Sequence, residues 1–487
     1  MKGRPIMRQS VSRDDSDGKR RFQSGWRQGA KRLKEKTSLQ SSTRFMKRFF
    51  NDYGMLLVLL VLCAFFSVLT YDEQHPTGVS GADALVRQLR AGAGAGETVL
   101  VVARGHAEDV AFAERIRTGL GAGGLDVLEV VTGEPSDARK ALRRISESGR
   151  RLDHIAGNQV TAGWLVFADL KKDFPSLGEP RVSQPGSHHW PNFLKRDNLL
   201  NISNQIAVIA ILAIGMTFVI ITAGIDLSVG SLIALSAVVS AWCIRNWAGG
   251  EAAGAAGMVL SCLAGVAVCG VVGGFTGVMV TRFSVPPFIV TLGMMMVASG
   301  LAYIVAKGGS IYQVPDSFVR LGRGADLPGI PNAVLLMLGL YAIAHLVMSR
   351  SRLGRQLYAV GGNPEAARLS GVPVARVLLF AYVMSGLLAG LGGVVMASQL
   401  KSGSPTYGQM YELYTIAAVV VGGTSLAGGE GKMFGTLIGA FIIAVIQNGM
   451  NLTNVEPYTQ KVVLGAVILA AVLLDRFKQQ GWRWAAA

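Results

Sequence analysis

Ten apolar segments, most of them close to 20 residues long, limit what this chain can fold into. They cover 53–71 and fall near 203–222, 227–245, 256–281, 286–306, 332–349, 374–397, 412–428, 433–452 and 458–475. An α-helix of about 20 apolar residues spans the hydrocarbon core of a bilayer. Charged residues make up 16% of the chain, whereas a soluble domain is about a quarter charged. The sequence therefore predicts an α-helical polytopic membrane protein with about ten transmembrane helices, and it excludes a purely soluble enzyme.

The distribution of charge predicts how these helices are oriented. Residues 1–52 hold 15 Lys and Arg against five acidic residues, which is typical of a tail that stays in the cytoplasm. The apolar segment 53–71 ends in polar residues without a small-residue cleavage site, so we interpret it as an uncleaved anchor and first transmembrane helix. Ten crossings then place residues 72–190 outside, and 350–373 and the C-terminus 477–487 inside. The basic residues of 349–376 and 477–487 agree with this count.

Residues 72–190 have the composition of a soluble domain, with 14 basic and 16 acidic residues. Their periodicity predicts a β-α-β-α-β unit with parallel strands. The expected elements are a strand over 97–103, a helix over 108–120, a strand over 125–131, a helix over 136–148 capped by Ser136, and a strand over 163–170. We therefore expect a small extracytoplasmic α/β insert between the first two crossings, followed by a membrane domain over 191–476. His188 and His189 are expected in a solvated linker after it.

The segment GGNPEAARLSGVPV, at 361–374, predicts a very short helix with a signal at each end. Asn363 is a good N-cap, Pro364 suits the first helical position, and Glu365 favours the positive end of the helix. Gly371 can take the left-handed conformation that ends a helix. Because so short a helix is marginal in water, it should lie against its own protein or against a partner.

Three motifs, GGNPEAARLSGVPV, GMTFVIITAGIDLSVGSLIAL at 215–235 and AAVVVGGTSLAGGEGKMFGTLIGA at 417–440, together resemble one family. It is the membrane permease subunit of ribose-type monosaccharide ABC importers, and the similarity runs through nearly all of 193–475. The resemblance implies a permease that forms the translocation path for a ribose-like sugar in the bacterial inner membrane. It also implies an ATP-binding cassette ATPase subunit, an extracytoplasmic sugar-binding protein and a second permease copy, in a homodimer or a heterodimer, as partners. The coupling helix that contacts the ATPase would consist of Asn363, Pro364, Glu365, Ala366, Ala367, Arg368, Leu369, Ser370 and Gly371.

Polar residues within the apolar segments are candidates for the transport path. Asp226 lies between two apolar segments, where an unpaired carboxylate is costly, and it is either a functional group or the cap of the next helix. Ser228 and Ser231 follow it in the first turn. Gln447, Asn448 and Asn451 either line a polar path for a hydroxylated solute or bind neighbouring helices.

Several alternatives remain at this point. An ion-coupled secondary transporter of a small polar solute would need buried ionisable residues, and the segments hold almost none besides Asp226. A P-loop is absent, because Leu426 stands where its first glycine should be, so we expect ATP hydrolysis in a separate subunit. No cofactor, metal or nucleic acid is expected, and the four cysteines lack the spacing of metal ligands.

The insert resembles one lobe of a type I periplasmic sugar-binding protein. Two roles stay open for it: contact with an external binding protein, or none, as an inert insertion.

The spacing of glycines predicts how the helices meet. Three pairs lie four residues apart: Gly273 and Gly277, Gly386 and Gly390, and Gly435 and Gly439. This spacing lets helix backbones approach closely in a membrane. The alternative is that membrane helices simply tolerate glycine at these positions.

Overall fold

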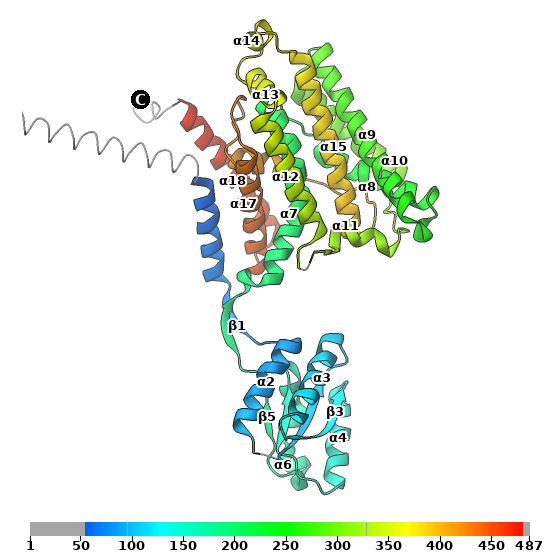
Figure 1. The fold of residues 1–487 in the computed structure, drawn as a ribbon, viewed down its shortest axis with the longest axis vertical. Helices are drawn as coiled ribbons and strands as arrows, with labels where there is room; N and C mark the ends of the chain where they lie inside the picture. Colours follow the sequence, from blue (N-terminus) through cyan, green and yellow to red (C-terminus); the bar gives the residue numbers. More distant parts are fainter. Residues whose placement is uncertain (1–53, 95, 328, 481–487) are drawn as a thin grey trace, which may run out of the picture. The chain divides into compact units, whose positions relative to one another are not determined.

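The computed structural model describes residues 54–480 apart from 95 and 328, and it divides into two compact units (Figure 1). One unit is Phe66–Asn198, and the other is formed by the rest of the described chain. The basic tail 1–52 and the C-terminus 481–487 lie outside the described residues.

The unit Phe66–Asn198 is built on a parallel sheet with helices on both faces. In its described residues the strand order is β3-β2-β4-β5. The strands of this sheet are β2 (Thr98–Ala103), β3 (Asp126–Thr132), β4 (His154–Gly157) and β5 (Arg181–Ser183). The helices are α2 (Gly78–Gly92), α3 (Ala107–Gly121), α4 (Pro135–Glu147), α5 (Gln159–Ala162) and α6 (Leu170–Asp173). A separate antiparallel pair, β1 (Tyr71–Gln74) with β6 (His188–Pro191), joins the two ends of the insert.

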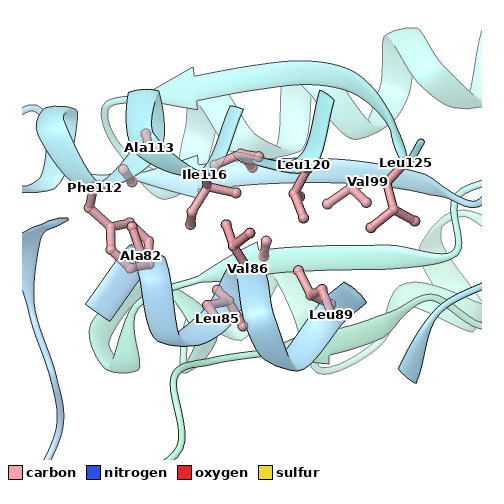
Figure 2. Close-up of a cluster of buried hydrophobic side chains, with 13 residues drawn as sticks. Ala82, Leu85, Val86, Leu89, Val99, Phe112, Ala113, Ile116, Leu120 and Leu125 are labelled. Atoms are coloured by element: carbon pink, nitrogen blue, oxygen red, sulfur yellow. The ribbon is translucent and has the colours of Figure 1, made fainter. Parts of the chain in front are cut away.

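Strand β2 is the centre of this unit because its side chains are buried on both faces. Val99, Val101 and Ala103 pack against α2 and α3, and Figure 2 shows Val99 with the apolar side chains of these two helices. Leu100 and Val102 point the opposite way and pack against α4. This alternation is the period of two that a strand buried between two helical layers requires.

Most elements expected in the insert are present, and three expectations were wrong. The third strand is β4, His154–Gly157, and not 163–170. The segment 163–170 instead contains a 3-10 turn at Leu165–Phe167, and the side chain of Leu165 is 88% exposed, so this apolar run does not enter the sheet. Helix α4 is capped by Glu134, which forms a capping box with Asp137, and not by Ser136. His188 and His189 are exposed, as expected, but they lie in strand β6, which pairs with β1, and not in a linker.

Each of the ten expected apolar segments contains a helix in the described residues, but the segment expected at 412–428 is helical only as far as Val421. Seven of these helices are long and apolar enough to cross a membrane. They are α7 (Arg196–Ile221), α8 (Val229–Asn246), α9 (Ala255–Arg282), α10 (Pro287–Ala306), α12 (Asn332–Arg350), α15 (Val374–Leu400) and α17 (Met433–Leu452). Three apolar helices are shorter: Gly54–Leu69, α16 (Tyr411–Val421) and the Pro457–Leu473 part of α18 (Pro457–Gln480). The helical class is confirmed, while the count of ten crossings stays a prediction.

The glycine pairs lie where helix backbones approach one another, as the spacing predicts. A Cβ on Gly273 would meet the carbonyl oxygen of Tyr382, and a Cβ on Gly386 would meet that of Cys269, so α9 and α15 pack backbone to backbone. A Cβ on Gly439 would overlap the carbonyl oxygen of Ala418, which places α17 equally close to α16. These contacts make α15 and α17 part of a tight interior that carries the polar residues described next.

Candidate functional site

The segment 361–371 folds into the short capped helix that its sequence predicts. Helix α14 (Pro364–Leu369) begins after Asn363, whose side-chain oxygen accepts a hydrogen bond from the Ala366 amide at 3.0 Å. Gly371 takes a positive φ of 82° and ends the helix. Helix α13 (Arg352–Gly362) precedes it, with only Asn363 between the two helices. Figure 1 shows α14 projecting at the end of the membrane unit, beyond the ends of α12 and α15.

The surface of α14 has the character of a contact surface. Of the nine expected coupling residues, Ala367 is buried and the other eight are exposed. Glu365 and Arg368 form an exposed ion pair, which contributes little to stability. The side chain of Leu369 is 89% exposed at the end of this capped helix. An apolar tip beside two opposite charges offers a partner both a hydrophobic contact and a defined polarity.

Asp226 lies in a closed hydrogen-bonded cluster. Its carboxylate is 1% exposed and accepts bonds from the Ser228 amide at 3.0 Å, the Ser228 hydroxyl at 2.6 Å and the Ser385 hydroxyl at 2.7 Å. The bond to the Ser228 amide is a local turn that starts α8, and the bond to Ser385 attaches this turn to α15. These three donors stabilise the buried carboxylate. The N-cap residue of α8 is Ser228, so Asp226 is not itself the cap that the sequence suggested; it holds the turn that precedes the helix.

Gln447 and Asn451 line a cavity of about 180 Å³. The cavity is lined from four helices, α7, α16, α17 and α18, by Gln205, Ile206, Ile209, Tyr411, Tyr414, Ala444, Gln447, Asn451 and Gln460. Asn451 also accepts a 2.8 Å bond from Gln460, so it both faces the cavity and links α17 to α18. The rings of Tyr411 and Tyr414 lie 6.1 Å apart and tilted by 62°. Neutral amides beside aromatic rings suit an uncharged hydroxylated solute, which needs hydrogen bonds and an apolar face.

Ser231 lines a second hollow of about 430 Å³, to which α16 contributes Glu412. Its lining includes Ser299 of α10, Tyr407 and Glu412. The irregular segment 401–410 leads into α16 here, and Met410 has a positive φ of 68°. Irregular backbone at membrane depth is tolerated where it lines a cavity or is buried in protein. Asn448, the remaining candidate, is buried and is not among the lining residues of either cavity.

The sequence prediction missed several cavity residues. Gln205, Tyr411, Tyr414, Gln460 and Glu412 were not candidates, although Glu412 carried a signal as an ionisable residue at the start of an apolar segment. The others become neighbours only through the packing of helices distant in the sequence. Across residues 54–480, gaps at 95 and 328 aside, no group of three or more His, Cys, Asp or Glu side chains is placed to hold a metal.

Comparison with known proteins identifies relatives of the membrane unit. Residues 198–472 match the family described as "Branched-chain amino acid transport system / permease component". The chain is 44% identical over 293 residues to the ribose import permease protein of Escherichia coli strain K12, an alignment that covers 59% of this chain and 88% of the relative. It is 43% identical over 290 residues to the ribose import permease protein of Bacillus subtilis strain 168, covering 59% and 87%. It is 38% identical over 284 residues to the D-allose transport system permease protein of E. coli K12, covering 58% and 85%. No solved structure matches the chain.

Proposed function

The chain belongs to the family of transport-system permease components, and from this premise we propose that it is the membrane permease subunit of an ATP-binding cassette importer for a monosaccharide. The observation that carries the proposal is the similarity to ribose and allose permeases over more than four fifths of their length. The relatives give no support to the alternative of an ion-coupled transporter. ATP hydrolysis belongs to a separate subunit, and this chain is a permease component of the inner membrane.

We propose that α14 is the contact with the ATPase. Its exposed residues Glu365, Arg368 and Leu369 form a projecting tip of the kind that fits a groove, and the caps at Asn363 and Gly371 together with the buried Ala367 define its shape. ATP-driven closure of the ATPase pair would displace this tip. The membrane helices would convert the displacement into alternating access for the sugar.

We place the transport path beside α16. Gln447 and Asn451, with Gln205 and the two tyrosines, offer a solute hydrogen bonds without a formal charge. The same helix contributes Glu412 to the hollow that Ser231 lines, so a movement of α16 would change both cavities. Asp226 and Ser228 hold the start of α8 in place and are assigned no contact with the solute.

The assembly and orientation follow from the same proposal. A second permease copy, identical or not, completes the membrane part, and an extracytoplasmic sugar-binding protein delivers the sugar. The insert faces the outside together with its receptor, while 1–52, α14 and 477–487 face the cytoplasm, as the positive-inside rule favours. Contact with the receptor and an inert insertion are both compatible with the fold of the insert.

Co-purification tests the proposal. The tagged full chain, extracted in mild detergent, should bring with it an ATPase that carries Walker motifs. The same cells should take up labelled ribose or a related sugar only when the full chain is present. Sugar uptake that needs an ion gradient and no ATPase would overturn the proposal.

A further inference from the structure

Gly361, near the end of α13, lies in direct backbone contact with two other parts of the membrane unit. A Cβ on Gly361 would overlap the carbonyl oxygen of Ile221, the last residue of α7, and would lie 2.6 Å from the amide nitrogen of Gly429. The Gly429 amide donates a hydrogen bond to this same Ile221 carbonyl at 2.9 Å. The backbones of α13, of the end of α7 and of the segment around Gly429 are therefore in direct contact with one another.

The loop 422–432, between α16 and α17, is shaped to make this contact. Gly428 and Gly429 have φ values of 86° and 74°, which favour glycine. A Cβ on Gly428 would lie 2.8 Å from the Gly361 carbonyl oxygen, and one on Gly429 would lie 2.9 Å from the Cα of Gly362. The Tyr358 hydroxyl donates a 2.7 Å hydrogen bond to the Gly431 carbonyl and ties the same loop to α13.

These elements connect α14 to the cavity around Gln447. Gly361 is two residues before Asn363, the cap of α14, so a displacement of α14 moves Gly361. The partners of Gly361 are the end of α7 and the loop between α16 and α17, and all three of these helices line the cavity. Contacts between backbones are stiff, because no side chain can change its rotamer to absorb the movement.

We propose that Tyr358, Gly361 and the segment Gly428–Gly431 form a joint that transmits the displacement of α14 to α7, α16 and α17. The proposal rests on the proposed function and adds positioning residues to it. These residues contact neither the ATPase nor the sugar. They set how much solute movement each displacement of α14 produces.

Gly361→Ala and Gly362→Ala form a matched pair that tests the joint. The two positions are adjacent in the sequence, but a Cβ on Gly362 meets no described atom within 4 Å. Each variant of the full chain is reconstituted in vesicles with its co-purified ATPase and binding protein, and sugar imported per ATP hydrolysed is measured. We expect Gly361→Ala to keep its ATPase bound and to lower this ratio roughly tenfold, a usual size for a coupling between sites, while Gly362→Ala keeps the ratio of the unmodified chain.

If Gly361→Ala does not accumulate in the membrane, the same ratio of sugar imported to ATP hydrolysed is measured for Tyr358→Phe. It removes one hydrogen bond without adding volume, and the ratio should fall about threefold. An unchanged ratio in assembled Gly361→Ala and Tyr358→Phe, or an equal fall in Gly362→Ala, would overturn the joint. Absence of ATP-dependent import by the unmodified chain would instead overturn the proposed function.

Discussion

The Asp226 carboxylate accepts a hydrogen bond from the Ser385 hydroxyl at 2.7 Å, although 159 positions separate the two residues. The bond attaches the turn between α7 and α8 to the middle of α15. Both side chains are 1% exposed, so water cannot replace either partner. Because Ser385 contacts the carboxylate directly, a substitution at Ser385 tests whether Asp226 has a structural role or a direct role in transport.

Ser385→Ala should destabilise the membrane unit by roughly 1–3 kcal/mol, because it removes a donor from a buried carboxylate. Thermal unfolding of the detergent-solubilised chain measures the change. Ser231→Ala, at a partly exposed serine in the wall of the larger hollow, should shift stability by less than about 0.5 kcal/mol. Loss of sugar uptake in Ser385→Ala without a change in melting would contradict the structural role and assign Asp226 to transport.

Exchanging the two charges of α14 tests its contact with the ATPase. The double variant Glu365→Arg with Arg368→Glu keeps an ion pair within the helix but reverses the charges presented to a partner. We expect the ATPase to co-purify poorly with both single variants and with the double variant. Recovery of normal co-purification in the double variant would mean that the pair serves only α14 itself.

Neighbouring amides on α17 offer a test of the smaller cavity. Gln447→Leu removes a polar group that faces the cavity, and we expect uptake at low sugar concentration to fall about two- to tenfold, as for one or two lost hydrogen bonds. Asn448→Leu, at a buried position outside the cavity lining, should instead change thermal stability and keep uptake per folded molecule. The opposite pattern would remove this cavity from the transport path.

The insert provides a prediction about pH. The hydrogen bond from His154 lowers the pKa of the Glu97 carboxyl, and the hydrogen bond from the Thr98 amide lowers the pKa of the Asp153 carboxyl. Because both pKa values are lower in the folded state, the stabilisation is complete above the unfolded values of about 4 and is lost as the pH falls through the folded values. A fragment covering 76–187 should melt cooperatively at pH 6 and at lower temperature at pH 3, and millimolar monosaccharide should not shift its melting.

Glu97→Gln is the control for this pH dependence. It should melt below the unmodified fragment at pH 6 and lose less stability on acidification, because one of the carboxyls whose pKa is lowered in the folded state is gone. An identical loss in both fragments would show that Glu97 does not contribute. Starting the fragment at residue 76 retains all of α2.

Much of the fold could be predicted because local sequence determines it. Apolar segments of membrane length formed helices, and Asn363, Pro364 and Gly371 marked the ends of α14 within one residue. Helix α2 was missed although Ala82, Leu85, Val86 and Leu89 follow a helical period, since the glycines on both sides of it are typical of a loop. Strand β4 was missed because four residues give too short a pattern to recognise.

The candidate site was less predictable because it depends on contacts between distant segments. Gln447 and Asn451 were recognised as polar residues in an apolar helix, but the sequence does not reveal that Gln205 and Tyr411 share their cavity. The contact of Gly361 with Ile221 and Gly429 likewise joins two helices and a loop that are far apart in the chain. Glycine spacing indicates that helix backbones can approach one another, but only the fold shows which helices are in contact.

ATP-dependent sugar uptake into vesicles tests the central claim most directly. The full chain, its co-purified ATPase and its binding protein are reconstituted, and labelled ribose is followed with ATP on the ATPase side and no ion gradient. The account predicts uptake that requires ATP, stops when the binding protein is omitted, and persists when ionophores collapse every gradient. Uptake that follows an imposed proton or sodium gradient and ignores ATP would contradict it.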